Sequence, residues 1–485
     1  MKISRLIKKR QRRLSLALAG MMMVMGPTAL AADLSLQEAI NMALTQNTGL
    51  KVTQKGEDTA QASLKKARGN NGVSVSATDT LSVSKSNDSD RRESNTAGVS
   101  ASMPLYSGGA NQAAIKKAEL GVKSADLLTE RDRENLKLNV IKAYYDALEA
   151  KKTVAVRQET VDKYQEHYTN VSQLYSAGAK ARIDVIRSSV ELSNARQNLI
   201  KAQNSYEVDL ATLRNYLNLN RTEPLNLTSD FSYDEFAIAM DDCIAYAYAN
   251  RKDLLVDQYK VEQQEQAVKA AKAGYLPSVS LNMGLDNSNV FHPASSSSNS
   301  VSASVGLKWS IFDGGVTDAA VKSAKTDYDV AKLTLLKDKE DVDLAVRQGY
   351  YNMREAEKRF NSTKDAVHQA EEDAYIAREK YRAGEGLMLD IIDAQEALST
   401  ARLNYISAQY DYARYKATVE NAMGISLNAS EQEAAAKLET DVDKTLDSSP
   451  IEQTGSAAAK ADTKAQAETT PAAVADELAG NEETK

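Results

Sequence analysis

The strongest constraint on the fold of this 485-residue chain is an internal duplication. Segments of the first half recur in the second half at a constant separation of 206 positions, the distance from Leu105 to Ile311. Self-similarity at a fixed spacing indicates that one structural unit is used twice. The matched segments are Leu105–Gly109 with Ile311–Gly315, Tyr144–Tyr145 with Tyr350–Tyr351, Tyr175–Gly178 with Tyr381–Gly384, and Asp184–Ile186 with Asp390–Ile392. The sequence therefore predicts two tandem repeats, residues 32–226 and residues 227–426.

Each repeat is expected to open with a helix and to continue with two strands. Ser35 with Glu38, and Ser232 with Glu235, have the spacing of capping boxes, which mark the starts of helices. The strands are predicted where apolar and polar residues alternate with a period of two, which gives each strand one apolar and one polar face. The apolar positions are Val73, Val75, Ala77, Leu81 and Val83; Val99, Ala101, Met103 and Leu105; Val279, Leu281, Met283 and Leu285; and Val301, Ala303, Val305, Leu307, Trp309 and Ile311.

Polar segments are expected to connect the two strands of each repeat. Lys85–Thr96 and Asp286–Ser300 are rich in Ser, Asn and Asp, which suits loops exposed outside a membrane. The strands themselves would then have about ten residues, the length that a tilted strand needs to cross a bilayer.

A Gly-Gly pair ends each pair of strands and precedes a long helix. Gly108 and Gly109, like Gly314 and Gly315, allow a backbone turn that other residues resist. The helical run from about Ala110 to Tyr175 would be on the order of 100 Å long. Apolar residues in these helices recur at steps of three and four, which predicts coiled-coil packing. The seam residues are Val154, Val161, Tyr164, Tyr168, Val171 and Tyr175; Phe360, Val367, Ala370, Ala374, Ala377 and Tyr381; and Leu199, Ala202, Tyr206, Leu210, Leu213 and Leu217.

Four two-faced strands per chain cannot close a membrane barrel, because the smallest barrels have about eight strands. An open sheet in lipid would leave unpaired backbone groups at a cost of several kcal/mol each. Several chains must therefore share one barrel: two would supply eight strands and three would supply twelve. Tyr106, Trp309 and Phe312 lie at the Gly-Gly ends, where an aromatic belt at the membrane interface belongs, although each would also fit a core.

The two ends of the chain differ from the repeats in composition. Basic residues precede the apolar stretch 14–25, and small residues follow at 29–31, so residues 1–31 are predicted to be a secretory signal peptide. Residues 427–485 are rich in Ala, Glu, Lys, Thr and Asp and contain no aromatic residue. Such a segment cannot bury enough apolar surface to offset its ordering entropy, so we predict a disordered acidic tail. The net charge of −7 owes much to this tail and gives no sign of nucleic-acid binding.

The sequence shows no pattern of catalytic or metal-binding residues. Cys243 is the single cysteine and can make no internal disulfide. His167, His292 and His368 lie far apart without metal-ligand spacing, and we interpret them as ordinary surface residues. No catalytic constellation and no phosphate-binding glycine loop is recognisable. The sequence thus predicts a protein that is not an enzyme and that has no cofactor and no metal site.

The repeats resemble the TolC family of outer-membrane efflux ducts over about residues 33–426. The resemblance rests on LSLQEAINMAL at Leu34–Leu44, AGYLPSVSL at Ala273–Leu281, SIFDGG at Ser310–Gly315, YRAG at Tyr381–Gly384 and LDIIDA at Leu389–Ala394. It implies an α+β membrane protein: a homotrimer with a twelve-stranded barrel surrounded by outer-membrane lipid, continuous with a periplasmic tunnel of twelve helices. It also implies a passive exit duct for tripartite efflux or type I secretion. The partners implied are a periplasmic adaptor and an inner-membrane pump of the RND, ABC or MFS type.

The resemblance assigns the tips of two helical hairpins to docking on the adaptor. A helix turn without any partner would explain the same glycines. The tip residues are Ala177, Gly178 and Ala179 in the first repeat and Ala383, Gly384 and Glu385 in the second.

Two aspartates beside the second tip are candidates for a selectivity ring. Asp390 and Asp393 are spaced i, i+3 and therefore share one face of a helix. The resemblance implies that such residues surround the periplasmic entrance, where converging carboxylates attract cations. Asp184 occupies the matching position of the first repeat, where Arg187 replaces the second aspartate. A simpler interpretation is that solvated aspartates near a helix N-terminus interact favourably with the helix dipole.

The chain departs from the family pattern at the residue that latches the closed entrance. Well-known members carry a basic residue two positions after the second tip glycine, where this chain has Gly386. Lys180 and Arg182 lie at the first tip instead. The latch is therefore expected to be rearranged or absent.

A trimeric coiled-coil tether of the envelope, or another surface structural protein without a pore, is the alternative interpretation. It explains the coiled-coil seam but not the four two-faced strands placed between helices. Membrane fractionation distinguishes the two: a duct is an integral trimer that resists SDS until heated, whereas a tether is released by high salt.

Deleting the tail after Ser430 is expected to leave assembly intact, because the tail has no apolar surface to contribute to a core. The measurement is the heat-sensitive trimer band on an SDS gel for the truncated and full-length chains. Loss of the trimer band on truncation would show that the tail is structural.

Overall fold

The computed structural model describes residues 32–86, 89–222, 224–292 and 294–426. The predicted signal peptide and the predicted acidic tail lie outside these residues. Both repeats follow one order: two helices, two strands, a helix of 67 residues and a helix of 36 residues. The first repeat contains α2 (Leu36–Gln46), α3 (Thr48–Gly69), β2 (Ser74–Ser86), β3 (Ser89–Tyr106), α4 (Ala110–Ser176) and α5 (Arg182–Leu217). The second contains α6 (Met240–Asn250), α7 (Lys252–Lys272), the short η1 (Ala273–Tyr275), β5 (Ser278–His292), β6 (Ser296–Lys308), α8 (Val316–Arg382) and α9 (Met388–Met423).

The opening helices confirm one predicted capping box and contradict the other. The Ser35 side chain accepts from the Glu38 amide, and the Glu38 carboxylate accepts from the Ser35 amide, so α2 begins as predicted. The prediction for Ser232 and Glu235 is wrong, because residues 228–239 form no helix and α6 begins at Met240.

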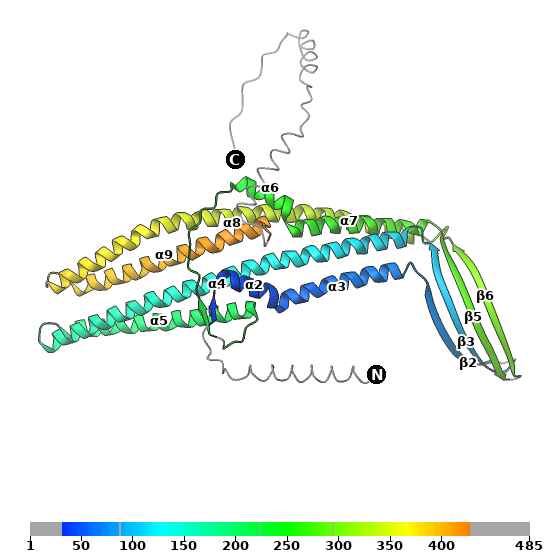
Figure 1. Cartoon of the computed structure of the whole chain (residues 1–485), viewed down its shortest axis with the longest axis horizontal. Coiled ribbons are helices and arrows are strands. Elements are labelled where there is room, and N and C mark those ends of the chain that lie inside the picture. The colour runs from blue at the N-terminus through cyan, green and yellow to red at the C-terminus, as the bar shows by residue number, and fades with distance from the viewer. Residues whose placement is uncertain (1–31, 87–88, 223, 293, 427–485) are drawn as a thin grey trace, which may run out of the picture. The chain divides into compact units, whose positions relative to one another are not determined.

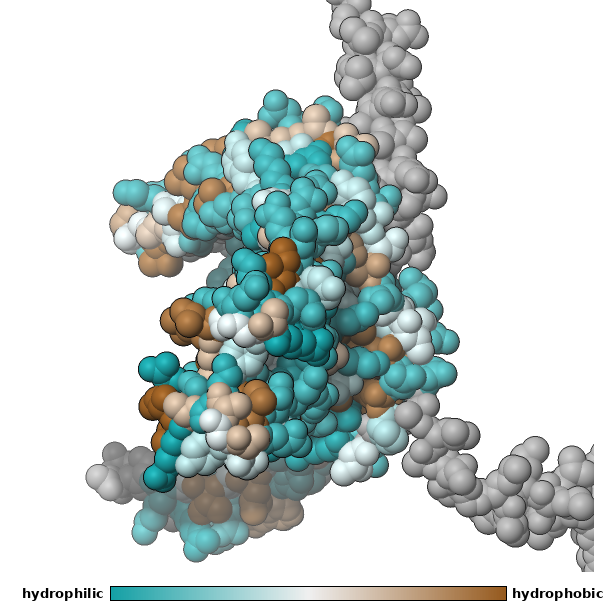
Figure 2. Space-filling model, turned by 90° about the vertical axis from the view of Figure 1, so that its left-hand side faces the viewer, coloured by the Kyte–Doolittle hydropathy of each residue, from teal (hydrophilic) through white to brown (hydrophobic). Residues whose placement is uncertain are grey.

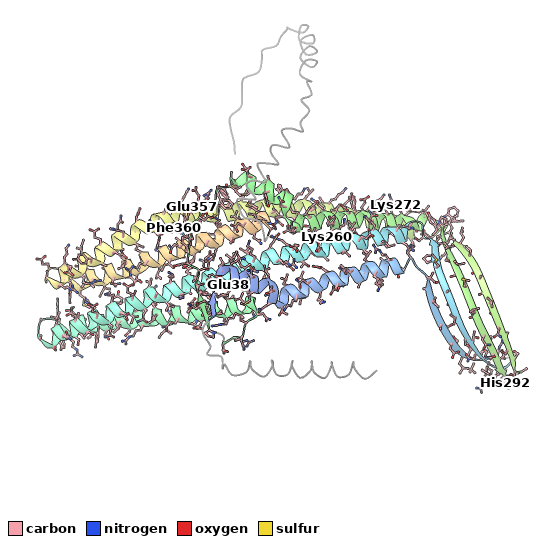
Figure 3. The ribbon with its side chains drawn as sticks, viewed as in Figure 1. Glu38, Lys260, Lys272, His292, Glu357 and Phe360 are labelled. Carbon is pink, nitrogen blue, oxygen red and sulfur yellow. The ribbon has the colours of Figure 1, made fainter. Side chains whose placement is uncertain are left out.

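Aromatic packing holds residues 228–239 in an irregular path. The rings of Phe231 and Tyr233 lie 5.6 and 5.8 Å from the ring of Phe360 in α8, and Phe236 is fully buried. The Tyr233 hydroxyl also donates to Glu357, one turn before Phe360 on the same helix (Figure 3). Tertiary contacts of three aromatic side chains have overridden a local helix signal.

The four long strands form one antiparallel sheet in the order β2-β3-β5-β6. The sheet lies at one end of the long helices, and the hairpin turns lie at the other end (Figure 1). Each outer strand, β2 and β6, has a hydrogen-bonded neighbour on one side only. A separate pair, β1 (Ala32–Leu34) and β4 (Leu225–Leu227), runs in parallel and ties the start of the first repeat to the junction between the repeats.

The strands are longer than predicted, and the two expected polar loops are mostly strand. The strands have 13, 18, 15 and 13 residues, and Ser82 pairs with Ser94 while Ser288 pairs with Ser298. The Asn287 amide donates to the Asn299 carbonyl at 2.6 Å across the strands. Polar side chains can pair across neighbouring strands as apolar ones do, so low hydrophobicity did not mark the ends of the strands.

The helices continue the order of the strands as a single layer. In the half of the layer next to the sheet, the helices lie in the order α3, α4, α7, α8. In the half next to the hairpin turns, the order is α5, α4, α9, α8 (Figure 1). The predicted seam is confirmed where Val161, Tyr164 and Val171 are buried, whereas Tyr175 is 44% exposed. Each level of the chain is thus four elements wide.

The middle of the layer holds the main core and joins the two repeats. The fully buried Tyr144 donates its hydroxyl to the Leu34 carbonyl at 2.8 Å and accepts from the Ser229 amide at 3.0 Å, which fixes the β1–β4 pair on α4. Arg414 of α9 lies 2.6 Å from Asp146 and 2.7 Å from Glu149 of α4. Charge-assisted contacts of a half-buried arginine therefore connect one helix of each hairpin.

The Gly-Gly turns have the backbone that the sequence predicts. Gly108 and Gly109 have φ values of +64° and +90°, and Gly314 and Gly315 have +68° and +88°. The two turns differ in their surroundings: a Cβ atom on Gly108 would lie 2.9 Å from the Ala273 carbonyl oxygen, whereas one on Gly314 would meet nothing within 4 Å.

Replacing Gly108 with Ala should therefore destabilise the protein more than replacing Gly314 with Ala. Both substitutions force a left-handed conformation on a residue with a Cβ, at about 1–2 kcal/mol, and only the first adds a clash with backbone. The measurement is the temperature at which the assembled protein dissociates in SDS. Equal shifts for the two variants would contradict the steric difference between the turns.

Candidate functional site

The hairpin turns between the long helices end in the same capping geometry. In the first turn the Ala179 amide donates to the Leu174 carbonyl and the Gly178 amide to the Tyr175 carbonyl, with Gly178 at φ +76°. This is a Schellman arrangement, which needs a left-handed residue after the helix. In the second turn, Gly384 at φ +80° and Glu385 donate to the carbonyls of Tyr381 and Lys380. The predicted tips, Ala177–Ala179 and Ala383–Glu385, are exposed in both turns.

The turns explain why a basic residue is missing at position 386. The Gly386 amide donates to the Lys380 carbonyl at 3.1 Å, and a Cβ at Gly386 would lie 2.9 Å from the Tyr381 amide nitrogen. Any larger side chain would have to push the turn away from the end of α8. At the first tip, the Lys180 ammonium lies 4.4 Å from the centre of the Tyr381 ring, so a basic group of one hairpin contacts the other hairpin.

The three candidate aspartates lie at the first turns of the return helices. Asp390 is exposed and accepts from the Leu387 amide at 2.9 Å, so it caps α9. This contact is the local role that the simpler interpretation of the aspartates predicts. Asp393 is exposed one turn further on, and Asp184 lies half-exposed in the first turn of α5.

Asp393 also faces the packed seam of the first hairpin. Burial raises the pKa of the Tyr164 hydroxyl, and the charges of Glu396, Glu191 and Asp393 add to that shift. Ile392, beside Asp393, packs against the cluster of Val161, Tyr164, Leu192 and Ala195. Asp393 is therefore exposed but close enough to the first hairpin for its charge to act on Tyr164.

His167 is not an ordinary surface histidine, so that prediction is wrong for one of the three. Its Nε2 atom is buried without a hydrogen-bond partner, and its ring centre lies 5.7 Å from that of Tyr381. His292 and His368 are exposed as predicted, and His292 lies at the end of the strands remote from the helices (Figure 3). The signal in the sequence was the position of His167, one helical turn after the seam residue Tyr164.

The hairpin ends are predominantly hydrophilic, with small separate apolar patches (Figure 2). The sheet, by contrast, presents a predominantly apolar face near the helices, which Asp79 interrupts and which becomes polar toward the far end of the strands. Its exposed apolar residues are Val75, Leu81, Val83, Val99, Met103, Leu105, Met283, Leu285, Val301, Val305 and Leu307. The opposite face carries Ser and Thr at most positions, as the alternation predicts.

The candidate aromatic belt lies where the strands meet the helices. Tyr106 is the last residue of β3, and Trp309 and Phe312 follow the end of β6, which stops at Lys308 rather than at Ile311. All three rings are at least 44% exposed, so none of them is part of a core within the chain. The Trp309 indole donates to the Tyr275 carbonyl at 3.1 Å, which fixes the ring at the edge of the sheet.

None of the helices in the described part of the chain is both long and apolar enough to span a membrane. Within the same residues, no three His, Cys, Asp or Glu side chains are grouped so that they could hold a metal ion.

Comparison with protein families gives one match that falls on both repeats. The family described as "Outer membrane efflux protein" matches residues 39–219 and 244–425. Among curated relatives, the outer membrane efflux protein BepC of Brucella suis is 21% identical over 71% of this chain and 75% of its own length. The outer membrane protein TolC of Escherichia coli is 23% identical over 62% of this chain and 63% of its own length.

Solved structures share the fold of the chain. The CmeC outer membrane channel of Campylobacter jejuni has a TM-score of 0.72 at 18% identity and covers 85% of this chain and 90% of its own. The open state of the Neisseria gonorrhoeae MtrE outer membrane channel has a TM-score of 0.67 at 18% identity, with 80% and 88% covered. At these identities the likeness establishes the fold, including four strands continuous with long helical hairpins.

Replacing Asp390 separates its capping role from its charge. Asp390→Ala should lower the free energy of unfolding by about 1 kcal/mol, the usual cost of a lost cap. Asp390→Asn should have a smaller effect, because the amide oxygen can still accept from the Leu387 amide. The measurement is the thermal midpoint of the two variants in detergent; a stability of Asp390→Ala equal to that of the native chain would contradict the capping role.

Proposed function

The chain belongs to the outer membrane efflux protein family, and on that premise we propose that three copies form one passive exit duct through the outer membrane. The duct would receive its substrate from an inner-membrane pump, by way of a periplasmic adaptor. The observation that carries the proposal is the open four-element layer: a two-faced sheet with two unpaired edges that continues into a layer of helices with two uncovered flanks.

The strand order allows closure by identical copies. Neighbours in the sheet are antiparallel throughout, so β2 and β6 run in opposite directions. The β6 edge of one copy would therefore meet the β2 edge of the next as a further antiparallel pair. Repeating this step closes a barrel with no free edge, the only way in which strands satisfy their backbone groups in lipid.

The flanking helices expose the apolar surface that such neighbours would cover. α8 forms one flank near the sheet and near the hairpin turns, while α6 and residues 228–239 pack on its middle. It exposes Val330, Leu333, Leu336 and Leu344 by 52–65%. α5 forms the opposite flank near the hairpin turns, and it exposes Ile183, Ile186, Val190, Ile200 and Val208 by 49–64%. Apolar side chains that are exposed on both helices favour association with a partner surface.

The two faces of the sheet would meet different surroundings in the barrel. The face rich in Val, Leu and Met would contact lipid, and the face rich in Ser and Thr would line a wet interior. Tyr106, Trp309 and Phe312 would then lie at the periplasmic boundary of the membrane, where aromatic side chains are favoured. A tether without a pore does not explain why one face of the sheet is polar and the other apolar.

The exposed tips are the part of the chain that would meet the adaptor. Ala177–Ala179 and Ala383–Gly384 carry small or no side chains on capped turns, so a partner helix could approach them closely, and Glu385 adds an exposed carboxylate beside them. The pump would be of the RND, ABC or MFS type and would supply both the energy and the choice of cargo. The relatives include a "Toxin and drug export protein A" and an "Alkaline protease secretion protein AprF", which supports either efflux or type I secretion.

The aspartates would ring the narrow periplasmic entrance. Asp390 and Asp393 are exposed on the first turns of α9, and three copies would bring six carboxylates to one mouth. Asp184 would add one more from each first hairpin. Carboxylates converging on a narrow passage raise the local concentration of cations and repel anions.

The purified full-length protein should form cation-selective channels in planar bilayers. Asp390→Asn with Asp393→Asn should weaken that selectivity, because the charge is lost while the caps are largely kept. The measurement is the reversal potential in a salt gradient. The matched control is Asp58→Asn with Asp126→Asn, which removes two exposed carboxylates from α3 and α4 and should leave the selectivity unchanged.

A protein that never conducts would contradict the exit duct. An unchanged ion preference in Asp390→Asn with Asp393→Asn would reject only the assignment of the entrance ring.

A further inference from the structure

The contacts between the two hairpins change in kind toward the tips. Near the middle, Arg414 of α9 binds Asp146 at 2.6 Å, and further out Arg402 binds Glu159 at 2.8 Å. The Thr160 hydroxyl then donates to the Ser399 hydroxyl at 3.4 Å. Beyond this point, no hydrogen bond or ion pair joins the hairpins within the described ranges. There, the ring of Tyr381 makes a ring–ring contact with His167 and a cation–π contact with Lys180.

The Tyr381 side chain of the second hairpin is buried against side chains of the first hairpin. It is only 6% exposed although it is one residue from the end of α8. Its ring contacts the imidazole of His167 on α4 and the ammonium of Lys180 at the first tip. The Tyr381 hydroxyl and the His167 Nε2 atom are both buried without a hydrogen-bond partner. Both residues line a small open pocket between the hairpins.

The charged groups facing this pocket are mostly basic. α4 contributes Lys163 and Glu166, α8 contributes Arg378 and Arg382, and α9 contributes the neutral side chains of Ile391 and Gln395. Lys163 lies 3.7 Å from Glu166, and Arg382 lies 3.0 Å from Glu379, which is on the same helix. A further positive charge at His167 would therefore join a site in which only one lining residue is acidic.

We propose that His167 is a proton-sensing contact, which holds the two hairpins together while its imidazole is neutral and lets them separate once it is protonated. The proposal rests on the proposed function, because the hairpin ends would then form the entrance of the duct. Protonation would thus favour the open entrance, and the pump-docked duct would open more easily in acid.

The direction of the pH effect follows from the burial of the ring. Burial lowers the pKa of His167 in the closed contact; Glu166 opposes this shift and Lys180 adds to it. In an open entrance the imidazole is solvated and returns toward its ordinary pKa of about 6.5. The contact is therefore fully stable above that pH and loses stability as the pH falls below it, because the open state binds the proton more tightly.

The contact occurs once in each chain, because the repeats differ here. The position 206 residues after His167 is Asp373, and Tyr175, which matches Tyr381, is exposed. The duplication alone therefore does not require the His167–Tyr381 pair, and a trimer would contain three such contacts.

The test is the conductance of the full-length protein in planar bilayers between about pH 8 and about pH 5, where imidazoles titrate and ordinary carboxylates do not. The native chain should conduct several-fold more at the acidic end, with a midpoint below the ordinary imidazole pKa. His167→Phe, which keeps a ring against Tyr381 but cannot titrate, should show no such rise. His167→Gln is the second variant, in case Phe is too large for the site.

His368→Gln is the matched control, because His368 is exposed on α8, and it should respond to pH as the native chain does. A native conductance that stays constant or falls in acid would overturn the proposal, as would a full response in both His167 variants.

Hydrogen exchange of residues 163–171 and 374–382 supplies a readout that needs no conduction. Exchange corrected for intrinsic rate should increase in acid in the native chain and not in His167→Phe; equal behaviour would also overturn the proposal. Failure to conduct at every pH would contradict the exit duct instead.

Discussion

The unpaired backbone edges of β2 and β6 are the constraint on which the rest of the structure depends. Strands of 13 residues leave a row of amide and carbonyl groups on each edge. In lipid each unsatisfied group costs several kcal/mol, so a whole row of them would outweigh the stability of an ordinary domain. A sheet with a predominantly apolar face is suited to lipid, and its edges must then be paired by further strands. In the proposed assembly, identical copies would provide them without any change of strand direction.

The helices next to the sheet lie in the same order as the strands to which they are joined. Because α3, α4, α7 and α8 continue the strands, they form a layer in the same order, with flanks that are as uncovered as the strand edges. In the proposed assembly, the exposed apolar residues of α8 and α5 would be available for contact with other copies, as the strand edges would. Closure of the barrel and closure of the tunnel are one event, since the same chain supplies both layers.

The sequence predicted the repeated features of the fold well, because periodicity reports on them directly. The Gly-Gly turns, the long helices that follow them and the faces of the strands were all visible in the spacing of residues. The ends of the strands were not, since the Ser and Asn residues of 85–96 and 286–300 pair across strands as readily as they form loops. The irregular path of residues 228–239 could not be predicted either, because it depends on packing against Phe360, which is distant in sequence.

In the candidate site, too, local features could be predicted and contacts between distant residues could not. The tips and the aspartates were placed by local signals, namely glycines after long helices and carboxylates in the first turn. The contact of His167 and Lys180 with Tyr381 joins residues about 200 positions apart, so the local sequence, which places His167 one turn after the seam residue Tyr164, does not identify its partner. Gly386 was visible as a departure, but its cause, the close approach to the end of α8, appears only in three dimensions.

The most direct measurement of shared closure is the mass of the protein component of the purified particle in detergent, obtained by light scattering with refractive-index and absorbance detection. We expect three chains in every particle, and rapid precipitation when the detergent is removed without lipid. A single chain that remains dispersed in plain buffer would show that β2 and β6 need no partners, and would contradict a duct built from sister subunits.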